Sequence, residues 1–191
     1  MSMTEQELLV DCLQRLNGVG APYMLTGSMA SNYWGIPRST HDVDFVVQLP
    51  RSSIPSFMRA FADSYFLQQS SIESAYEPPH QFNAIDERSG FKVDFWMLRR
   101  DQFELAMFAR RTAVQLFGLE AWIATSEDVI LHKLFWNKLG PSERQLGDAA
   151  GVMAVQEAKL DQQYLRQWAS HLGVQHELEE LLAGRIKPKW T

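Results

Sequence analysis

Residues 37–46 read PRSTHDVDFV, which places two acids at the start of an apolar run. Asp42 and Asp44 flank a single valine and lead into residues that favour β-strands, so the sequence predicts a strand over residues 42–48. Because side chains alternate along a strand, both carboxylates would face the same way, with Cα atoms about 6.6–6.8 Å apart. Two negative charges held this close repel each other. The stretch therefore predicts either a cation between the carboxylates or a fully solvated turn.

The composition is that of a globular protein with enough apolar material for a core. The chain has 191 residues, of which 46% are hydrophobic and 21% charged, and its length favours one domain or one domain with an appended helical part. Cys12 is the single cysteine, so no internal disulfide can form and the sequence predicts a cytoplasmic protein. No apolar stretch approaches the ~18 residues of a membrane span, so no membrane partner is expected. The net charge of -5 argues against a generally basic surface for duplex DNA.

The order of predicted elements indicates a mixed α/β core followed by helices. Thr4 and Glu7 have the spacing of a capping box and begin a helix that stops at residues 17–20. Strands are predicted at residues 23–26 and 42–48, in a hairpin over residues 81–98, and in two apolar runs around Gly118. Further helices are predicted over residues 27–35, 51–67, 101–109, 125–139, 144–158, 161–172 and 175–183. We expect an α/β (α+β) core at residues 1–122, with a small mixed sheet flanked by helices, and a helical region at residues 123–191 packed on it.

Gly27 and Ser28 follow the first predicted strand and begin a helix. A helix start brings backbone N–H groups and the positive end of the helix dipole to one point, which suits phosphate oxygens. Glycine permits close approach of the backbone, and the serine hydroxyl adds a donor. Taken alone, the pair also fits an ordinary turn and helix cap, so both interpretations stay open.

A third acid, Asp94, lies in the run FKVDFWM, inside another predicted strand. Charged residues in a strand interior are normally paired or metal-bound. Lys92 shares the face of Asp94 by the period of two and is the candidate partner for a simple ion pair. Alternatively, Asp42, Asp44 and Asp94 together hold Mg²⁺, a cation that takes carboxylates, waters and substrate phosphates as ligands.

The run TGSMASNYWGIPRSTHDVDFVV, together with Asp94, resembles the signature of the DNA-polymerase-beta-like nucleotidyltransferase superfamily. That signature has Gly-Ser or Gly-Gly at a helix start, Asp-x-Asp in the next strand and a third acid in a later strand. The RSTHDVD form is similar to the abortive-infection-type (AbiEii-like) toxin nucleotidyltransferases and to small antibiotic nucleotidyltransferases. Thr26 stands where the family usually has an apolar residue, and the spacing from Ser28 to Asp42 is longer than usual.

The resemblance implies a nucleotidyltransferase fold and the transfer of a nucleoside monophosphate from a nucleoside triphosphate, such as ATP, to an acceptor. It implies two Mg²⁺ ions, replaceable by Mn²⁺, held by Asp42, Asp44 and Asp94. Asp94 would then lie near the attacking hydroxyl and is also the candidate general base.

The resemblance also implies a set of nucleotide-binding residues: Gly27, Ser28, Arg38, Lys133 and Asp148. In this role Lys133 steadies the triphosphate as a point charge. From the residues alone, Lys133 equally fits a surface lysine whose stem lies along apolar neighbours. Asp148 equally fits a weak surface pair with Arg144, four residues earlier on a predicted helix.

The acceptor is not specified by the sequence. Transfer RNA or other RNA, a protein hydroxyl and a small molecule are all compatible with it. The arginine pairs at residues 99–100 and 110–111 either attract an anionic acceptor or are solvated helix ends. A second hypothesis is an inactive nucleotidyltransferase-fold protein that serves as a binding module or as the partner of an antitoxin protein. A third is an α/β domain whose acids form salt bridges only.

Overall fold

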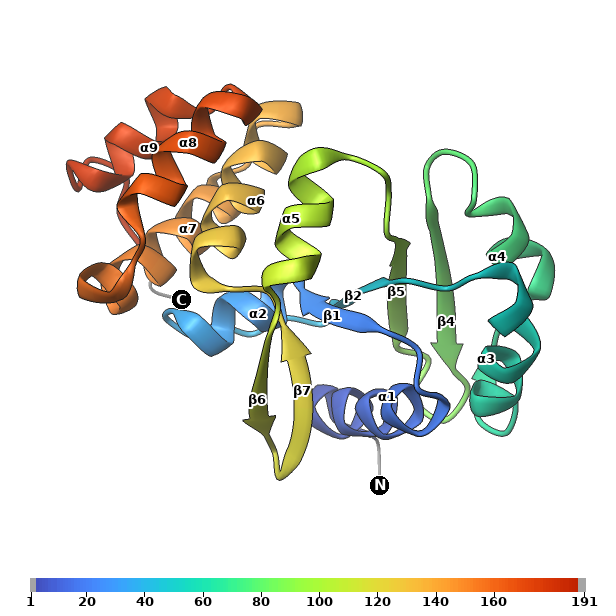
Figure 1. The fold of residues 1–191 in the computed structure, drawn as a ribbon. Coiled ribbons are helices and arrows are strands. Elements are labelled where there is room, and N and C mark those ends of the chain that lie inside the picture. Colours follow the sequence, from blue (N-terminus) through green and yellow to red (C-terminus); the bar gives the residue numbers. More distant parts are fainter. Residues whose placement is uncertain (1–2, 189–191) are drawn as a thin grey trace. The chain divides into compact units, whose positions relative to one another are not determined.

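The computed structural model describes residues 3–188 and divides into two compact units (Figure 1). The sheet unit comprises the chain up to Thr26 together with Thr40–Ile123. The helical unit comprises Gly27–Ser39 together with the chain from Ala124 onward. The mixed α/β class predicted from the sequence is confirmed, because a mixed sheet with flanking helices forms the first unit.

The described part of the sheet unit has one seven-stranded sheet, in the order β3-β4-β5-β2-β1-β7-β6. Its strands are β1 (Tyr23–Thr26), β2 (Val43–Val47), β3 (Tyr65–Phe66), β4 (Gln81–Asp86), β5 (Lys92–Met97), β6 (Thr112–Leu116) and β7 (Leu119–Ile123). β2 runs parallel to β5 and antiparallel to β1, while β1 runs parallel to β7. The β4–β5 and β6–β7 pairs are antiparallel, and β3 pairs with β4. The two central strands, β2 and β5, therefore have their carboxyl ends at the same edge of the sheet.

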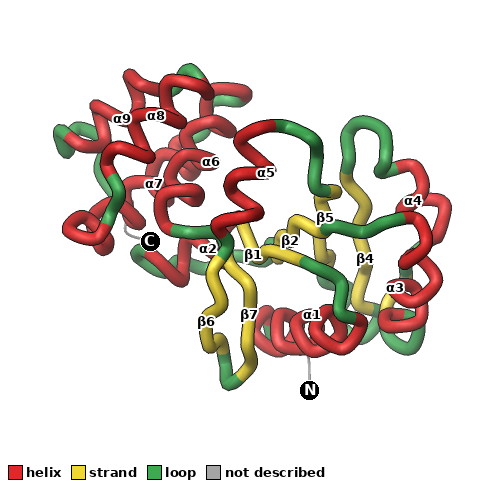
Figure 2. The backbone as a smooth tube through the Cα atoms, in the orientation of Figure 1, coloured by secondary structure: helices red, strands yellow, loops and turns green. Residues whose placement is uncertain are grey.

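The helices of the sheet unit are α1 (Glu5–Val19), α3 (Ile54–Phe61), α4 (Gln69–Ser74) and α5 (Gln102–Arg110), with a 3-10 turn, η1 (Arg51–Ser53). The predicted capping box begins α1, since the Thr4 hydroxyl accepts from the Glu7 N–H at 3.2 Å and the Glu7 carboxylate accepts from the Thr4 N–H at 2.8 Å. The helix ends before Gly20, whose φ of 65° is left-handed and suits glycine. α1 contacts α3, and the two lie side by side in Figures 1 and 2.

Phenylalanine rings form the centre of the sheet unit. The register pairs Phe45 of β2 with Phe95 of β5, and Phe95 with Phe82 of β4, so these three residues form one row, which we call the phenylalanine row. Helix α3 adds Phe57 and Phe61, whose ring centroids lie 5.3 and 5.6 Å from that of Phe95. Burying a ring of this size contributes about 2–3 kcal/mol. The row therefore lies on the face of the sheet that α3 covers.

The helices of the helical unit are α2 (Gly27–Trp34), α6 (Ser126–Leu139), α7 (Glu143–Gln156), α8 (Gln162–Leu172) and α9 (Gln175–Leu182), with a 3-10 turn, η2 (Glu157–Lys159). Thr125 caps α6 by accepting from the Asp128 N–H at 3.3 Å. α2 packs on α6 and α7, and a Cβ at Gly35 would lie 2.6 Å from the backbone nitrogen of Val152. Glycine is therefore required where the end of α2 meets α7.

The predicted helices and strands agree closely with the observed ones except between residues 51 and 74. The predicted helix over residues 51–67 is too long, because α3 ends at Phe61 and Tyr65–Phe66 form β3. The short helix α4 was not predicted. The structure also differs from the predicted division at residue 122, since residues 27–39 group with the C-terminal helices. Within residues 3–188, no helix has both the length and the apolar character needed to cross a bilayer.

Candidate active site

A row of polar residues crosses the sheet one residue away from the phenylalanine row. The register pairs Thr26 of β1 with Asp44 of β2, and Asp44 with Asp94 of β5. It continues by pairing Asp94 with Asn83 of β4. Because successive side chains of a strand point to opposite faces, this polar row lies on the face opposite the phenylalanine row. The alternation that buries the rings thus brings the carboxylates of Asp44 and Asp94 side by side.

Asp94 is the most deeply buried of the three predicted acids, with 8% of its surface exposed. Its Oδ2 atom lies 2.8 Å from the Nζ atom of Lys92, so the ion pair considered from the sequence is present. Its Oδ1 atom is buried and has no hydrogen-bond partner among residues 3–188. A buried polar atom without a partner costs about 1–3 kcal/mol, so a donor or a cation at Oδ1 would be stabilising.

The Lys92 ammonium interacts electrostatically with all three acids. The hydrogen bond to Asp94 raises the pKa of Lys92 above its usual value, more than burial lowers it, and the charges of Asp94, Asp42 and Asp44 raise it further. One ammonium therefore lies within the combined negative field of the three carboxylates. Such a field favours cations, and half of the Lys92 side chain is exposed, so this ammonium can exchange with solvent cations.

The other two acids lie at the beginning of β2. The Nε1 atom of Trp96 donates to Oδ1 of Asp44 at 3.3 Å, and Trp96 shares the face of Asp94 because it lies two residues further along β5. Asp42 directly precedes β2 and is half-buried. Its backbone N–H donates to the Thr40 hydroxyl at 3.2 Å, which orders the turn into the strand. The alternative of Asp42 in a fully solvated turn is therefore wrong.

The donor chemistry of this cluster fits a hard divalent cation. Carboxylate oxygens are the ligands that Mg²⁺ prefers, and Asp94 offers an oxygen that no group within residues 3–188 satisfies. In the described part of the chain, however, no three His, Cys, Asp or Glu side chains are arranged as a complete metal site. Mg²⁺ commonly takes only one or two protein carboxylates and completes its shell with waters and substrate phosphates. The three-carboxylate metal site therefore stays a prediction.

The helical unit contains a second cluster, formed by Ser28, Arg38, Lys133 and Asp148, which we call the cationic cluster. The Arg38 Nε and Nη2 atoms lie 2.7 and 2.9 Å from the two carboxylate oxygens of Asp148. Lys133 Nζ lies 2.8 Å from Oδ2 of Asp148, and Arg38 Nη2 also donates to the Ser28 hydroxyl at 2.9 Å. Two cations and one anion leave a net charge of +1 beside the N-terminus of α2.

Asp148 organises this cluster. Burial raises the pKa of its carboxyl, but the hydrogen bond from Arg38 and the charge of Lys133 outweigh burial, so the pKa lies below its usual value. Asp148 is thus ionised and fixes the direction of both cations. Asp148 pairs with Arg38 and Lys133 and not with Arg144, so the interpretation of Asp148 and Arg144 as a surface pair is wrong. Lys133 is buried and held by an ion pair, so the surface-lysine interpretation is also wrong.

The eight predicted site residues fall into two groups. Asp42, Asp44 and Asp94 belong to the sheet unit, and the five predicted nucleotide-binding residues belong to the helical unit.

Gly27 begins α2 with a left-handed φ of 61°, and its carbonyl accepts from the Ser31 hydroxyl at 3.0 Å. This conformation is favourable only for glycine and lets the chain turn directly from β1 into the helix.

Three residues beside the acids were not predicted from the sequence to belong to the site: Thr26, Asn83 and Trp96. Thr26 and Asn83 are paired in register with the acids, and Trp96 donates to Asp44. The hairpin over residues 81–98 was predicted, so counting back from its turn could have paired Asn83 with Asp94. The parallel register of β2 and β5 has no comparable local signal, because the two strands are far apart in sequence.

Two solved structures are similar to this chain in fold. The crystal structure of an antigenic nucleotidyltransferase-like protein from Paracoccidioides brasiliensis has a TM-score of 0.61 and 16% identity, over 100% of this chain and 96% of that one. The solution structure of the antibiotic-resistance factor ANT(2″)-Ia has a TM-score of 0.51 and 14% identity, over 97% of this chain and 92% of that one.

The chain therefore has the nucleotidyltransferase fold, and the resemblance seen in the sequence is confirmed at the level of the fold. At these identities the likeness concerns the fold alone. No protein-family model matches the sequence, and no curated protein gives a significant sequence match.

Proposed function

We propose that this protein is a Mg²⁺-dependent nucleotidyltransferase that moves a nucleoside monophosphate from a nucleoside triphosphate to an acceptor. One observation carries the proposal: on a nucleotidyltransferase fold, Asp44 and Asp94 are neighbours in register, and a buried Asp94 oxygen has no hydrogen-bond partner among the described residues. A fold gains nothing in stability from that arrangement unless a cation or a hydrogen-bond donor joins it.

In this proposal the three acids form the reaction centre. Asp42 and Asp44 would hold Mg²⁺ with the triphosphate, and together with Asp94 they would hold a second ion; Mn²⁺ could replace either. When bound, these ions supply Lewis-acid stabilisation of phosphate charge. Asp94 accepts the proton of the acceptor hydroxyl. The acceptor oxygen forms a bond to the α-phosphorus while the bond from that phosphorus to the β-bridging oxygen breaks, and pyrophosphate leaves with the electron pair.

The cationic cluster supplies the second function, which is binding of the triphosphate. The N-terminus of α2, with Gly27 and Ser28, offers N–H and hydroxyl donors to phosphate oxygens. Arg38 and Lys133 add positive charge, and Asp148 is a positioning residue that holds both cations at fixed distances. A preorganised cluster of this kind loses little side-chain entropy when the nucleotide binds.

The acceptor is the least constrained part of the proposal. A small molecule is supported by the name of one structural neighbour, an antibiotic-resistance factor, whereas RNA, including tRNA, and a protein hydroxyl remain open. We also propose a cytoplasmic location, where nucleoside triphosphates and Mg²⁺ are abundant and the single buried Cys12 would stay reduced.

The Lys92–Asp94 ion pair favours a second candidate function. An ammonium held at 2.8 Å from Asp94 can take the place of a metal ion permanently, which would leave an inactive nucleotidyltransferase-fold module that binds a partner such as an antitoxin protein. Calorimetry with MgATP and MgCTP separates the two candidates. An enzyme should give a heat of nucleotide binding that depends on Mg²⁺, and an inactive module should give no such heat.

Transfer is tested with each α-labelled nucleoside triphosphate, with and without Mg²⁺, in the presence of total RNA, of protein and of small hydroxyl compounds. We expect label on one acceptor class, and loss of at least a hundredfold in Asp42→Asn and in Asp94→Asn. Glu87→Gln is the matched control, since this exposed acid lies in the turn between β4 and β5, away from the polar row. Equal labelling in the wild type and the two Asp variants would reject the role of the acids.

A further inference from the structure

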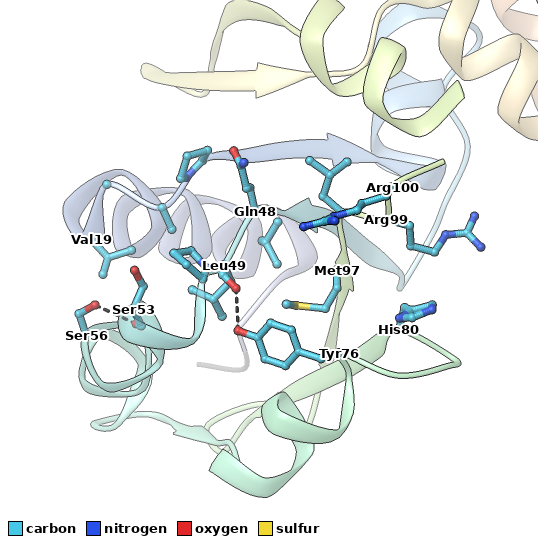
Figure 3. Close-up of a pocket in the computed structure, with 16 residues that line it drawn as sticks. Val19, Gln48, Leu49, Ser53, Ser56, Tyr76, His80, Met97, Arg99 and Arg100 are labelled. Carbon is cyan, nitrogen blue, oxygen red and sulfur yellow. Dashed lines mark hydrogen bonds between the residues drawn. The ribbon is translucent and has the colours of Figure 1, made fainter. Parts of the chain in front are cut away.

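A cavity of about 740 Å³ opens at the carboxyl ends of the parallel strands β2 and β5 (Figure 3). Its volume falls within the range of roughly 300–1,000 Å³ that is typical of small-molecule sites. In open α/β sheets, ligands commonly bind outside the carboxyl ends of parallel strands. All residues that line this cavity belong to the sheet unit.

The cavity is separate from the acids. Asp44 lies near the beginning of β2, whereas Val47 and Gln48 at its end line the cavity. Three residues of strand span about 10 Å. No residue of the polar row lines the cavity. A ligand in this cavity therefore does not touch the polar row.

The apolar part of the cavity is built around Tyr76 and Met97. The Tyr76 hydroxyl donates to the Leu49 carbonyl at 2.7 Å, the bond drawn in Figure 3. The Arg51 guanidinium lies over the Tyr76 ring, 4.2 Å from its centroid. Both contacts fix the ring, so it offers a rigid surface to an apolar group. Met97 is an adaptable neighbour because its thioether chain adjusts to ligand shape.

Two arginines, Arg99 and Arg100, line the side of the cavity next to His80, across from Ser53 and Ser56 in Figure 3. Arg99 forms an ion pair with Glu104, which largely offsets its positive charge. Arg100, in contrast, forms no hydrogen bond or ion pair with any of residues 3–188. A guanidinium that lines a cavity without a protein partner is suited to an anionic group of a ligand.

The backbone at His80 strengthens this interpretation. Its φ of 61° is left-handed, a conformation that costs a non-glycine residue free energy. The chain maintains it with two hydrogen bonds, from the His80 N–H to the Glu77 carbonyl at 2.9 Å and from the Met97 N–H to the His80 carbonyl at 2.8 Å. These bonds hold His80 on the same side of the cavity as Arg100.

From this arrangement we infer that the cavity is a binding site for a small organic anion that carries a ring or short aliphatic group. The anionic group meets Arg100, and the apolar group packs on Tyr76 and Met97. Neither part suffices alone, because the anion would otherwise stay hydrated and the apolar group would have no orienting contact.

The test uses three probes of matched size or charge: phenyl phosphate, phenol and inorganic phosphate. Each is titrated into the ¹⁵N-labelled chain of 191 residues, and binding is followed by changes in the amide chemical shifts. We expect saturable binding of phenyl phosphate with Kd on the order of 1 mM, as its size allows. Phenol and inorganic phosphate should bind at least tenfold more weakly. The largest shifts should fall at Gln48, His80 and residues 97–100.

Arg100→Gln should weaken phenyl phosphate binding at least fivefold. The matched control is Arg59→Gln, an exposed arginine on α3 that does not line the cavity, which should bind as the wild type does. Both positions are exposed, so neither variant should unfold. Equal binding by the two variants, or phenol binding as tightly as phenyl phosphate, would overturn the inference. Shifts confined to the polar row would overturn it as well and would leave the proposed nucleotidyl transfer unaffected.

Discussion

Replacing Asp148 by asparagine should destabilise the protein by about 3–5 kcal/mol, the cost of breaking a buried ion pair by removing one partner. The Asp148 and Lys133 side chains are only 6% and 8% exposed, and that of Arg38 is 14% exposed. Asparagine keeps the shape but removes the charge that offsets two nearly buried cations. Because domains are stable by only about 5–15 kcal/mol, a change of this size should be plain in urea or thermal unfolding.

Two further measurements separate this effect from a general loss of packing. Glu179→Gln is the matched control in the same unit, since its ion pair with Arg166 has side chains that are 55% and 53% exposed and should contribute under about 1 kcal/mol. Adding Lys133→Met to Asp148→Asn should restore part of the loss, because it removes a buried cation that has lost its ion pair with Asp148. A cost below about 1 kcal/mol for Asp148→Asn, or strictly additive losses in the double variant, would refute the ion-pair argument.

The pH dependence has a defined sign. The pKa of Asp148 is lower in the folded protein than its usual value, so the folded state binds this proton less readily than the unfolded chain does. The stabilisation is fully present above the unfolded value of about 3.9 and is lost as the pH falls through the lower folded value. Wild type should therefore lose more stability than Asp148→Asn on acidification below about pH 5, as unfolding curves at several pH values will measure.

Three other predictions address packing and the acids. Gly35→Ala should destabilise by about 1–3 kcal/mol in thermal unfolding, because its Cβ would lie 2.6 Å from the backbone of α7, whereas Gly140→Ala has no atom within 4 Å and should change little. Phe95→Ala should lower the free energy of unfolding in urea by about 3–5 kcal/mol, and a loss under about 2 kcal/mol would contradict the central place of Phe95 in the core. Lys92→Met should bind Mg²⁺ more tightly in calorimetry, because it removes the ammonium that competes for the Asp94 carboxylate. The control Lys159→Met should bind Mg²⁺ as the wild type does. Weaker binding by Lys92→Met would mean that the lysine supports the site.

Local signals in the sequence were sufficient for most of the fold. The capping box at Thr4, the turn at Ser89–Gly90 and the alternation around Asp44 each depend on neighbours within a few residues, and each predicted its element correctly. β3 has only two residues, which is too short for any periodic pattern, so it was absorbed into the preceding helix.

Contacts between distant residues were harder to predict. The bond from Arg38 to Asp148 joins positions 110 residues apart, and no periodicity indicates it. The resemblance to a family named both residues, but only the structure shows that they bind each other and share Lys133. The grouping of residues 27–39 with the C-terminal helices was missed for the same reason, since it depends on the approach of Gly35 to α7.

Because the phenylalanine row and the polar row are offset by one residue, the packing of the core and the alignment of the acids depend on the same strand register. If β2 slipped by a single position against β5, Asp44 would be forced among aromatic rings while Phe45 would turn to the polar side. Such a mispaired sheet would lose several rings from its core and bury an unpaired charge, so it would be rejected during folding. A population of this protein that has folded at all should therefore contain very few molecules with misaligned acids.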